Sequence, residues 1–239
     1  MSSKGVVKYD RYNDRVKERP TLSLDNNMIT IKLYSSHDEK SFQEEHVVHE
    51  TIFREASMVV DNAMAYDWAN KRERVVKLYD MESYIAFQVF KTWVYRHKII
   101  VERCYDTGVS SSSEIRLLLA AHHFGDKYKA IHFMDTVFDA ITKLHEGIYR
   151  DPQLGLIPSV WARTMTNSPL RRYFIDCIVH SKASAYNPFE LLKKLPEEFP
   201  TELAKAFMVA KFWPMGQGMP GDPCAYHVHV KGTCYKSLA

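Results

Sequence analysis

The most informative segment of this chain opens with the run VHETIFREAS (residues 48–57). The short apolar run VKLYD (residues 76–80) follows it, and the aromatic run FQVFKTWVY (residues 87–95) comes next. Apolar residues recur every three or four positions in the first and last runs, which is the spacing of one face of an α-helix. The middle run is short and, with the preceding Val75, holds the apolar residues Val75, Val76 and Leu78, which favours a short strand. This segment therefore predicts helix, strand and helix in that order.

The residues before this segment predict a β-hairpin. In MITIKLY (residues 28–34) Ile29, Ile31 and Leu33 alternate with Thr30 and Lys32, which is the period of a half-buried strand. Residues 41–48 can return beside it after a polar turn. Residues 50–65 predict two short helices, whose apolar face is Ile52, Phe53, Ala56, Val59, Val60 and Ala63.

The residues after this segment predict more helix. The aromatic run forms a helix in which Tyr84, Phe87, Phe90 and Val94 share a face, and residues 97–101 add a brief strand. Residues 115–124 and 128–144 then form a helical pair broken at Gly125. The core-facing stripe of its second helix is Ile131, Met134, Phe138 and Ile141.

Together these motifs resemble the BTB/POZ domain. Its members carry Val-His-Lys, two aliphatic residues and a Ser, and later an aromatic-rich helix ending in Trp-Leu-Tyr. FGDKY (residues 124–128) is similar to the hydrophobic-Ala-Asp-Lys-Tyr of the family's last hairpin, whereas Glu50 stands where the family has Lys. The resemblance covers residues 28–146 and implies an α+β fold, a small β-sheet with flanking helical hairpins.

A second resemblance extends the prediction towards the C-terminus. NSPLRRYFID (residues 167–176) and LPEEF (residues 195–199) resemble the helical extension of BTB proteins from filamentous fungi. Asn167 or Ser168 can cap the first of these helices, whose buried face carries Leu170, Phe174 and Cys177. We therefore predict a flexible segment at 1–26, a BTB/POZ domain at 27–147, an α-helical extension at 148–213 and a tail at 214–239.

Composition bounds the function. With 46% hydrophobic and 26% charged residues the chain is that of an ordinary globular protein, and its net charge of +3 is too small to indicate nucleic-acid binding. Residues 1–20 contain no apolar signal core, and no stretch reaches the ~18 apolar residues of a membrane span. The four cysteines are too few for a disulfide framework. We expect an intracellular protein, cytoplasmic or nuclear, without a membrane or direct nucleic-acid partner.

One cluster in the tail has the spacing of metal ligands. It is Cys224-x-x-His227-x-His229-x4-Cys234, and thiolate and imidazole are the ligands that zinc favours. On a strand, His227 and His229 would point the same way. The alternative is a flexible tail in which these residues coincide by chance. Similar cysteine and histidine endings occur in some fungal BTB relatives, so the resemblance also implies a structural zinc ion here.

The remaining candidates for chemistry favour structural roles. His49 has no nucleophile or paired carboxylate beside it in the sequence, so we expect it to cap or bridge backbone groups. His122 and His123 are adjacent on a helix and cannot easily ligate one ion with His132. The chain has no glycine-rich phosphate loop. We expect neither catalytic nor cofactor-binding residues, and no enzyme.

The BTB resemblance implies a protein–protein interaction module that self-associates or binds a partner. One alternative is a substrate adaptor that binds a cullin-type ubiquitin ligase. Such adaptors carry a hydrophobic residue and then an acid before the last hairpin, where this chain has Leu117-Leu118-Leu119. The other alternative is a transcriptional regulator that acts through partners.

Overall fold

The computed structural model describes residues 26–69, 74–79, 84–101, 111–148, 154–180, 195–212, 224–230, 233–234 and 236. Within these residues the fold is α+β, as predicted, with one three-stranded sheet and eight α-helices. The chain divides into two compact units, residues 1–140 with 229–239, and residues 141–228. The predicted N-terminal segment lies outside the described residues up to residue 25, and the predicted domain boundaries stay predictions.

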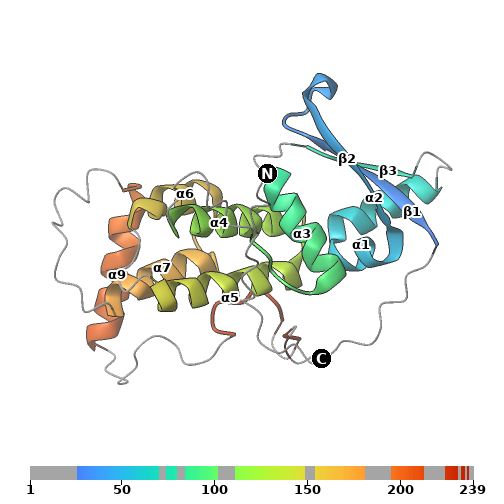
Figure 1. Ribbon diagram of the computed structural model, residues 1–239. Coiled ribbons are helices and arrows are strands. Elements are labelled where there is room, and N and C mark those ends of the chain that lie inside the picture. The colour runs from blue at the N-terminus through green and yellow to red at the C-terminus, as the bar shows by residue number, and fades with distance from the viewer. Residues whose placement is uncertain are drawn as a thin grey trace, which may run out of the picture. The chain divides into compact units, whose positions relative to one another are not determined.

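The sheet belongs to the first unit. Its strands are β1 (Met28–Tyr34), β2 (Phe42–His49) and β3 (Val75–Leu78), in the spatial order β2-β1-β3 (Figure 1). β2 runs antiparallel to β1 as the second strand of the predicted hairpin, and β3 runs parallel to β1. Because a parallel neighbour requires a crossover, the chain leaves the sheet between β2 and β3 through two helices. They are α1 (Glu50–Ala56) and α2 (Met58–Ala69).

An aromatic core covers one face of this sheet. Ile29, Ile31 and Leu33 are almost completely buried, so the predicted alternation of β1 is confirmed. The helix α3 (Tyr84–Arg96) brings Phe90 into this core, where its ring lies 5.7 Å from that of Phe53 in α1. Two further helices of this unit, α4 (Ser111–Lys127) and the first part of α5 (Ile131–Ile148), complete it. Their rings at Phe124 and Phe133 lie 5.1 and 5.2 Å from Phe90.

The break between α4 and α5 differs from the prediction. Gly125 lies inside α4, and the turn is at residues 128–130, where Lys129 adopts a φ of 52°. A Cβ on Gly125 would stand 2.5 Å from Met134 Cγ on α5. The glycine is therefore needed for the close approach of two helices and not for a chain break.

Several other details of the predicted pattern are wrong. Tyr84 and Ile131, predicted to face the core, are 51% and 43% exposed, because each lies in the first turn of its helix. Residues 97–101 form no strand, although Ile99 and Val101 are buried. In α1 and α2, Ile52, Phe53, Val60 and the unpredicted Met64 are buried, whereas three predicted positions are only half-buried: Ala56, Val59 and Ala63.

The second unit contains the predicted helical extension. Its helices are α6 (Ile157–Arg163), α7 (Pro169–His180) and α9 (Glu198–Phe212), together with the last part of α5 and a 3-10 turn at Leu154–Leu156. The hydroxyl of Ser168 accepts a hydrogen bond from the backbone N–H of Leu170, so Ser168 caps α7. The predicted buried face of α7, Leu170, Phe174 and Cys177, is confirmed.

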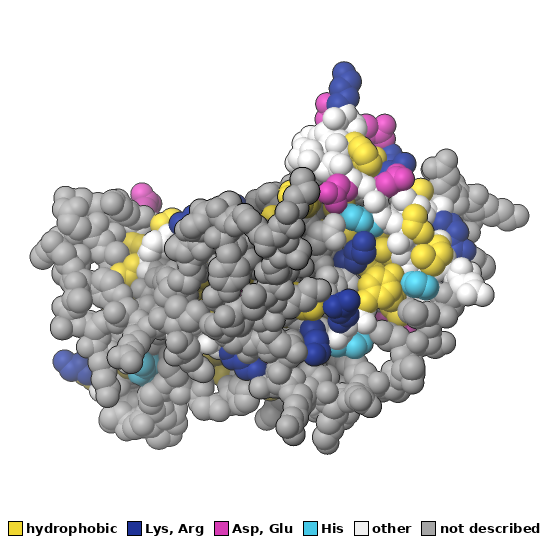
Figure 2. Space-filling view, in the orientation of Figure 1, with side chains coloured by type: hydrophobic (Ala, Val, Ile, Leu, Met, Phe, Trp, Pro, Cys, Tyr) yellow, Lys and Arg dark blue, Asp and Glu magenta, His cyan; other side chains and the backbone are white. Residues whose placement is uncertain are grey.

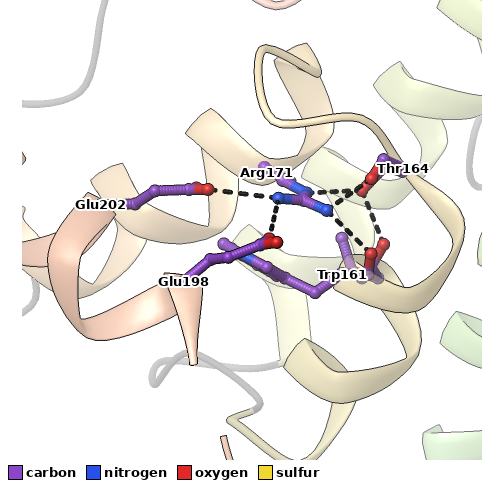
Figure 3. A network of polar contacts seen from close by, with 6 residues as sticks. Trp161, Thr164, Arg171, Glu198 and Glu202 are labelled. Atoms are coloured by element: carbon purple, nitrogen blue, oxygen red, sulfur yellow. Dashed lines mark hydrogen bonds and ion pairs between the residues drawn. The ribbon is translucent and has the colours of Figure 1, made fainter. Parts of the chain in front are cut away.

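A buried arginine joins the three helices of this unit (Figure 3). Arg171 on α7 is 5% exposed and lies 3.0 Å from Glu198 and 3.2 Å from Glu202 on α9. Its guanidinium also donates to the carbonyl oxygens of Trp161 and Thr164, at the end of α6. Arg171 is therefore a buried partner for two carboxylates and not part of a solvated helix face.

The described surface carries mixed charge. On the face in Figure 2, basic and acidic side chains lie near one another around the sheet. Ion pairs of strand residues join Lys77 to Glu39, at 2.5 Å, and Lys32 to Glu45, at 3.9 Å. Among the described helices, none combines the length and apolarity needed to cross a membrane.

Candidate metal centre

Two turns bring the four predicted ligands together. In the first, the backbone N–H of His227 donates to the carbonyl of Cys224 at 3.1 Å, which places these two residues at the ends of one turn. In the second, the N–H of Thr233 donates to the carbonyl of Val230 at 3.0 Å. The predicted strand through His227 and His229 is wrong, because residues 224–226 form a turn and His229 lies in a bend.

The ligand atoms are close enough for one ion. One donor atom from each of Cys224, His227, His229 and Cys234 lies within 4.8 Å of all the others. In a tetrahedral zinc site the ligand atoms stand about 3.3–3.8 Å apart, as follows from bonds of about 2.0–2.3 Å. A contraction of about 1 Å would therefore complete the site. His227 and Cys234 are buried, and the other two ligands are half-buried.

One hydrogen bond indicates which ring nitrogen of His229 could bind a metal. Its Nδ1 lies 2.7 Å from the carbonyl oxygen of Val230. A carbonyl only accepts, so Nδ1 carries the proton and Nε2 keeps the lone pair that a metal needs. Histidine ligands in metal sites commonly donate their second ring N–H to a carbonyl in this way. The carbonyl of Val230 also accepts from the hydroxyl of Thr233, so the same oxygen holds the turn and orients the ligand.

One of the two residues between the first two ligands is anchored on α7. Tyr226 is buried, and its hydroxyl donates to Asp176 at 2.7 Å. Burial, and then this hydrogen bond, raise the pKa of the Tyr226 hydroxyl above its usual range. Sequence reasoning missed this contact, although an aromatic residue flanked by two potential ligands in a tail rich in Gly and Pro was a usable signal.

Two of the other histidines considered in the sequence contact aromatic side chains. Nδ1 of His49 lies 3.1 Å from the Tyr95 hydroxyl, and the backbone N–H of His49 donates to the same oxygen at 3.2 Å, so His49 links the end of β2 to α3 through both its ring and its backbone. His122 is buried on α4, next to Phe138, and burial lowers its pKa to about 4. The ring of His46, which the sequence did not single out, stacks on Phe87 at 4.9 Å.

Four protein ligands would fill a tetrahedral site completely. Such closed sites are structural, whereas catalytic zinc keeps one position for water or substrate. The chain matches no protein-family model, and no curated protein matches it. The arrangement of the Cys/His cluster and the fold are therefore the observations from which a function can be argued.

Proposed function

We propose that this chain is a non-catalytic protein-interaction module with a BTB/POZ domain, and that a structural zinc ion organises its C-terminal segment. The observation that carries the first part is the path of the chain through the sheet. A hairpin, β1 and β2, is followed by the helices α1 and α2, by β3 parallel to β1, and then by α3. This is the element order that the BTB resemblance implies.

The side chains that carry the resemblance support the same proposal. Phe87, Phe90 and Trp93 of the aromatic run are buried together, and Tyr95 holds His49 at the end of β2. The hydroxyl of Tyr128, in the FGDKY motif, donates to the carbonyl of Tyr79 just after β3. The motif residues thus tie the strands to the helices, which is the work of a scaffold.

The donor set supports zinc as the metal. Two thiols and two imidazoles suit zinc better than the hard cations magnesium and calcium, which take oxygen ligands. Residues 214–239 contain few large apolar side chains, so the binding energy of a metal would supply the order that a core cannot. When bound, zinc would cross-link the two turns.

Stoichiometry tests the interaction function. The full chain would be expressed in two differently tagged forms, purified through one tag, and analysed by quantitative mass spectrometry and light scattering. We expect either the second tagged copy or one partner protein at a fixed molar ratio. The Phe90→Ala variant should no longer recover this second copy or partner, because the substitution damages the core. The Tyr84→Ala variant, on the same helix, should still recover it.

Two results would contradict the proposal. One is a monomeric chain that recovers no partner at a fixed ratio while it remains folded. The other is a measured turnover that a single polar substitution within residues 28–146 abolishes.

A further inference from the structure

The first turn of the metal cluster packs on helix α7. Tyr226 stands in the chain between the ligands Cys224 and His227 and is 6% exposed. Its ring meets that of Tyr173 edge to face, with centroids 5.4 Å apart. Its hydroxyl reaches Asp176, one turn further along α7. The two residues on α7 are three positions apart and so lie on one face of the helix.

A basic side chain on α7 holds the same turn. The guanidinium of Arg172 lies over the Tyr226 ring, 5.2 Å from its centroid. Arg172 also donates to the carbonyl oxygen of Ala225, the residue between Cys224 and Tyr226. One face of α7 therefore binds the backbone, the ring and the hydroxyl of the segment that carries two of the four ligands.

We infer that metal binding and the docking of Tyr226 on α7 are one coupled event, so that the cluster is a zinc-dependent latch covering this face of α7. The inference rests on the proposed zinc site. Zinc would fix Cys224 and His227, and with them the turn that aims Tyr226 at α7. Without the ion, Tyr226 has to be ordered by its own contacts, against the conformational entropy of a segment rich in Gly and Pro.

Coupling of this kind is reciprocal. If zinc strengthens the docking of Tyr226, then the docking of Tyr226 strengthens zinc binding by the same factor. Removal of the Tyr226 contacts should raise the dissociation constant for zinc by about tenfold, within the range of coupled sites. Tyr226→Phe, which loses one hydrogen bond and keeps the ring, should raise it by about fivefold.

Competition with a chelator measures the dissociation constant for zinc on the full chain. The variants would be Tyr226→Ala, Tyr226→Phe and Arg172→Ala. Arg172→Ala is decisive because the substitution lies on α7 and leaves the ligand segment intact. The control is Lys205→Ala, which also removes an exposed basic side chain from a helix of the same unit, α9 in place of α7. Hydrogen exchange of the peptide around Tyr226, with and without zinc, gives a second readout.

The outcomes separate the latch from the metal centre. The latch predicts weaker zinc binding in all three variants, unchanged binding in Lys205→Ala, and faster exchange around Tyr226 when zinc is removed. Equal zinc affinity in wild type and Arg172→Ala, with exchange that does not respond to zinc, would overturn the latch and leave the metal centre standing. A wild-type chain that binds no zinc would overturn the metal centre and the latch with it.

Discussion

Replacement of Phe90 by Ala tests the core on which the domain assignment depends. Phe90 is 1% exposed, and the rings of five other aromatic residues lie within 5.1–6.3 Å of its own. They come from α1, α3, α4 and α5, so the helices cannot close the space that a missing ring leaves without moving together. The substitution should therefore cost the full penalty for a buried aromatic residue, about 3–5 kcal/mol in the free energy of unfolding.

Urea unfolding, followed by circular dichroism, measures this cost. Tyr84→Ala is the matched control, because it removes another aromatic ring from the same helix at a position that is 51% exposed. It should change the free energy of unfolding by about 0.5 kcal/mol or less. Equal effects of the two substitutions would refute the reasoning, because they would mean that Phe90 is not packed more closely than Tyr84.

Three further predictions concern single side chains. Burial lowers the pKa of His122 from 6.5 to about 4, so the unfolded chain binds a proton between these pH values and the folded chain does not. Protonation of His122 should therefore lower the free energy of unfolding by about 3 kcal/mol from pH 7 to pH 4. In urea titrations His122→Leu should not show this pH-dependent decrease. Arg171→Met should lower the free energy of unfolding by about 3 kcal/mol, because it leaves Glu202 and the carbonyls of Trp161 and Thr164 without the guanidinium. Glu198→Gln changes an exposed carboxylate and should lower it by less than about 1 kcal/mol in the same assay. Gly125→Ala should cost about 1–3 kcal/mol and lower the melting midpoint, because its Cβ would overlap Met134; an unchanged midpoint would show that α5 can yield.

The sequence predicts those parts of the fold that follow from local periodicity. The alternation in β1, the hairpin with β2 and the face of α7 are confirmed because each depends on spacing along one element. The predicted burial of Tyr84 and Ile131 is wrong, because a periodic pattern does not tell where along its length a helix leaves the core.

Features that depend on tertiary approach escaped prediction. From the sequence alone, Gly125 is predicted to break a helix. Its role in letting α5 approach follows only from its distance to Met134 in the folded chain. Residue type and spacing predict the four candidate metal ligands, but the two turns on which they lie depend on backbone hydrogen bonds at Cys224 and Val230. The contact of Tyr226 with Asp176 joins residues fifty positions apart, beyond any local pattern.

The coordination of zinc in the purified chain is the measurement that tests the central claim most directly. X-ray absorption at the zinc edge should show two sulfur atoms at about 2.3 Å and two nitrogen atoms at about 2.0–2.1 Å, with no water, as in a closed structural site. Replacement of Cys224 and Cys234 by Ser should remove the signal, and Cys177→Ser should leave it unchanged. A zinc ion with a bound water would contradict a non-catalytic scaffold, and a chain that carries no zinc would contradict the metal centre.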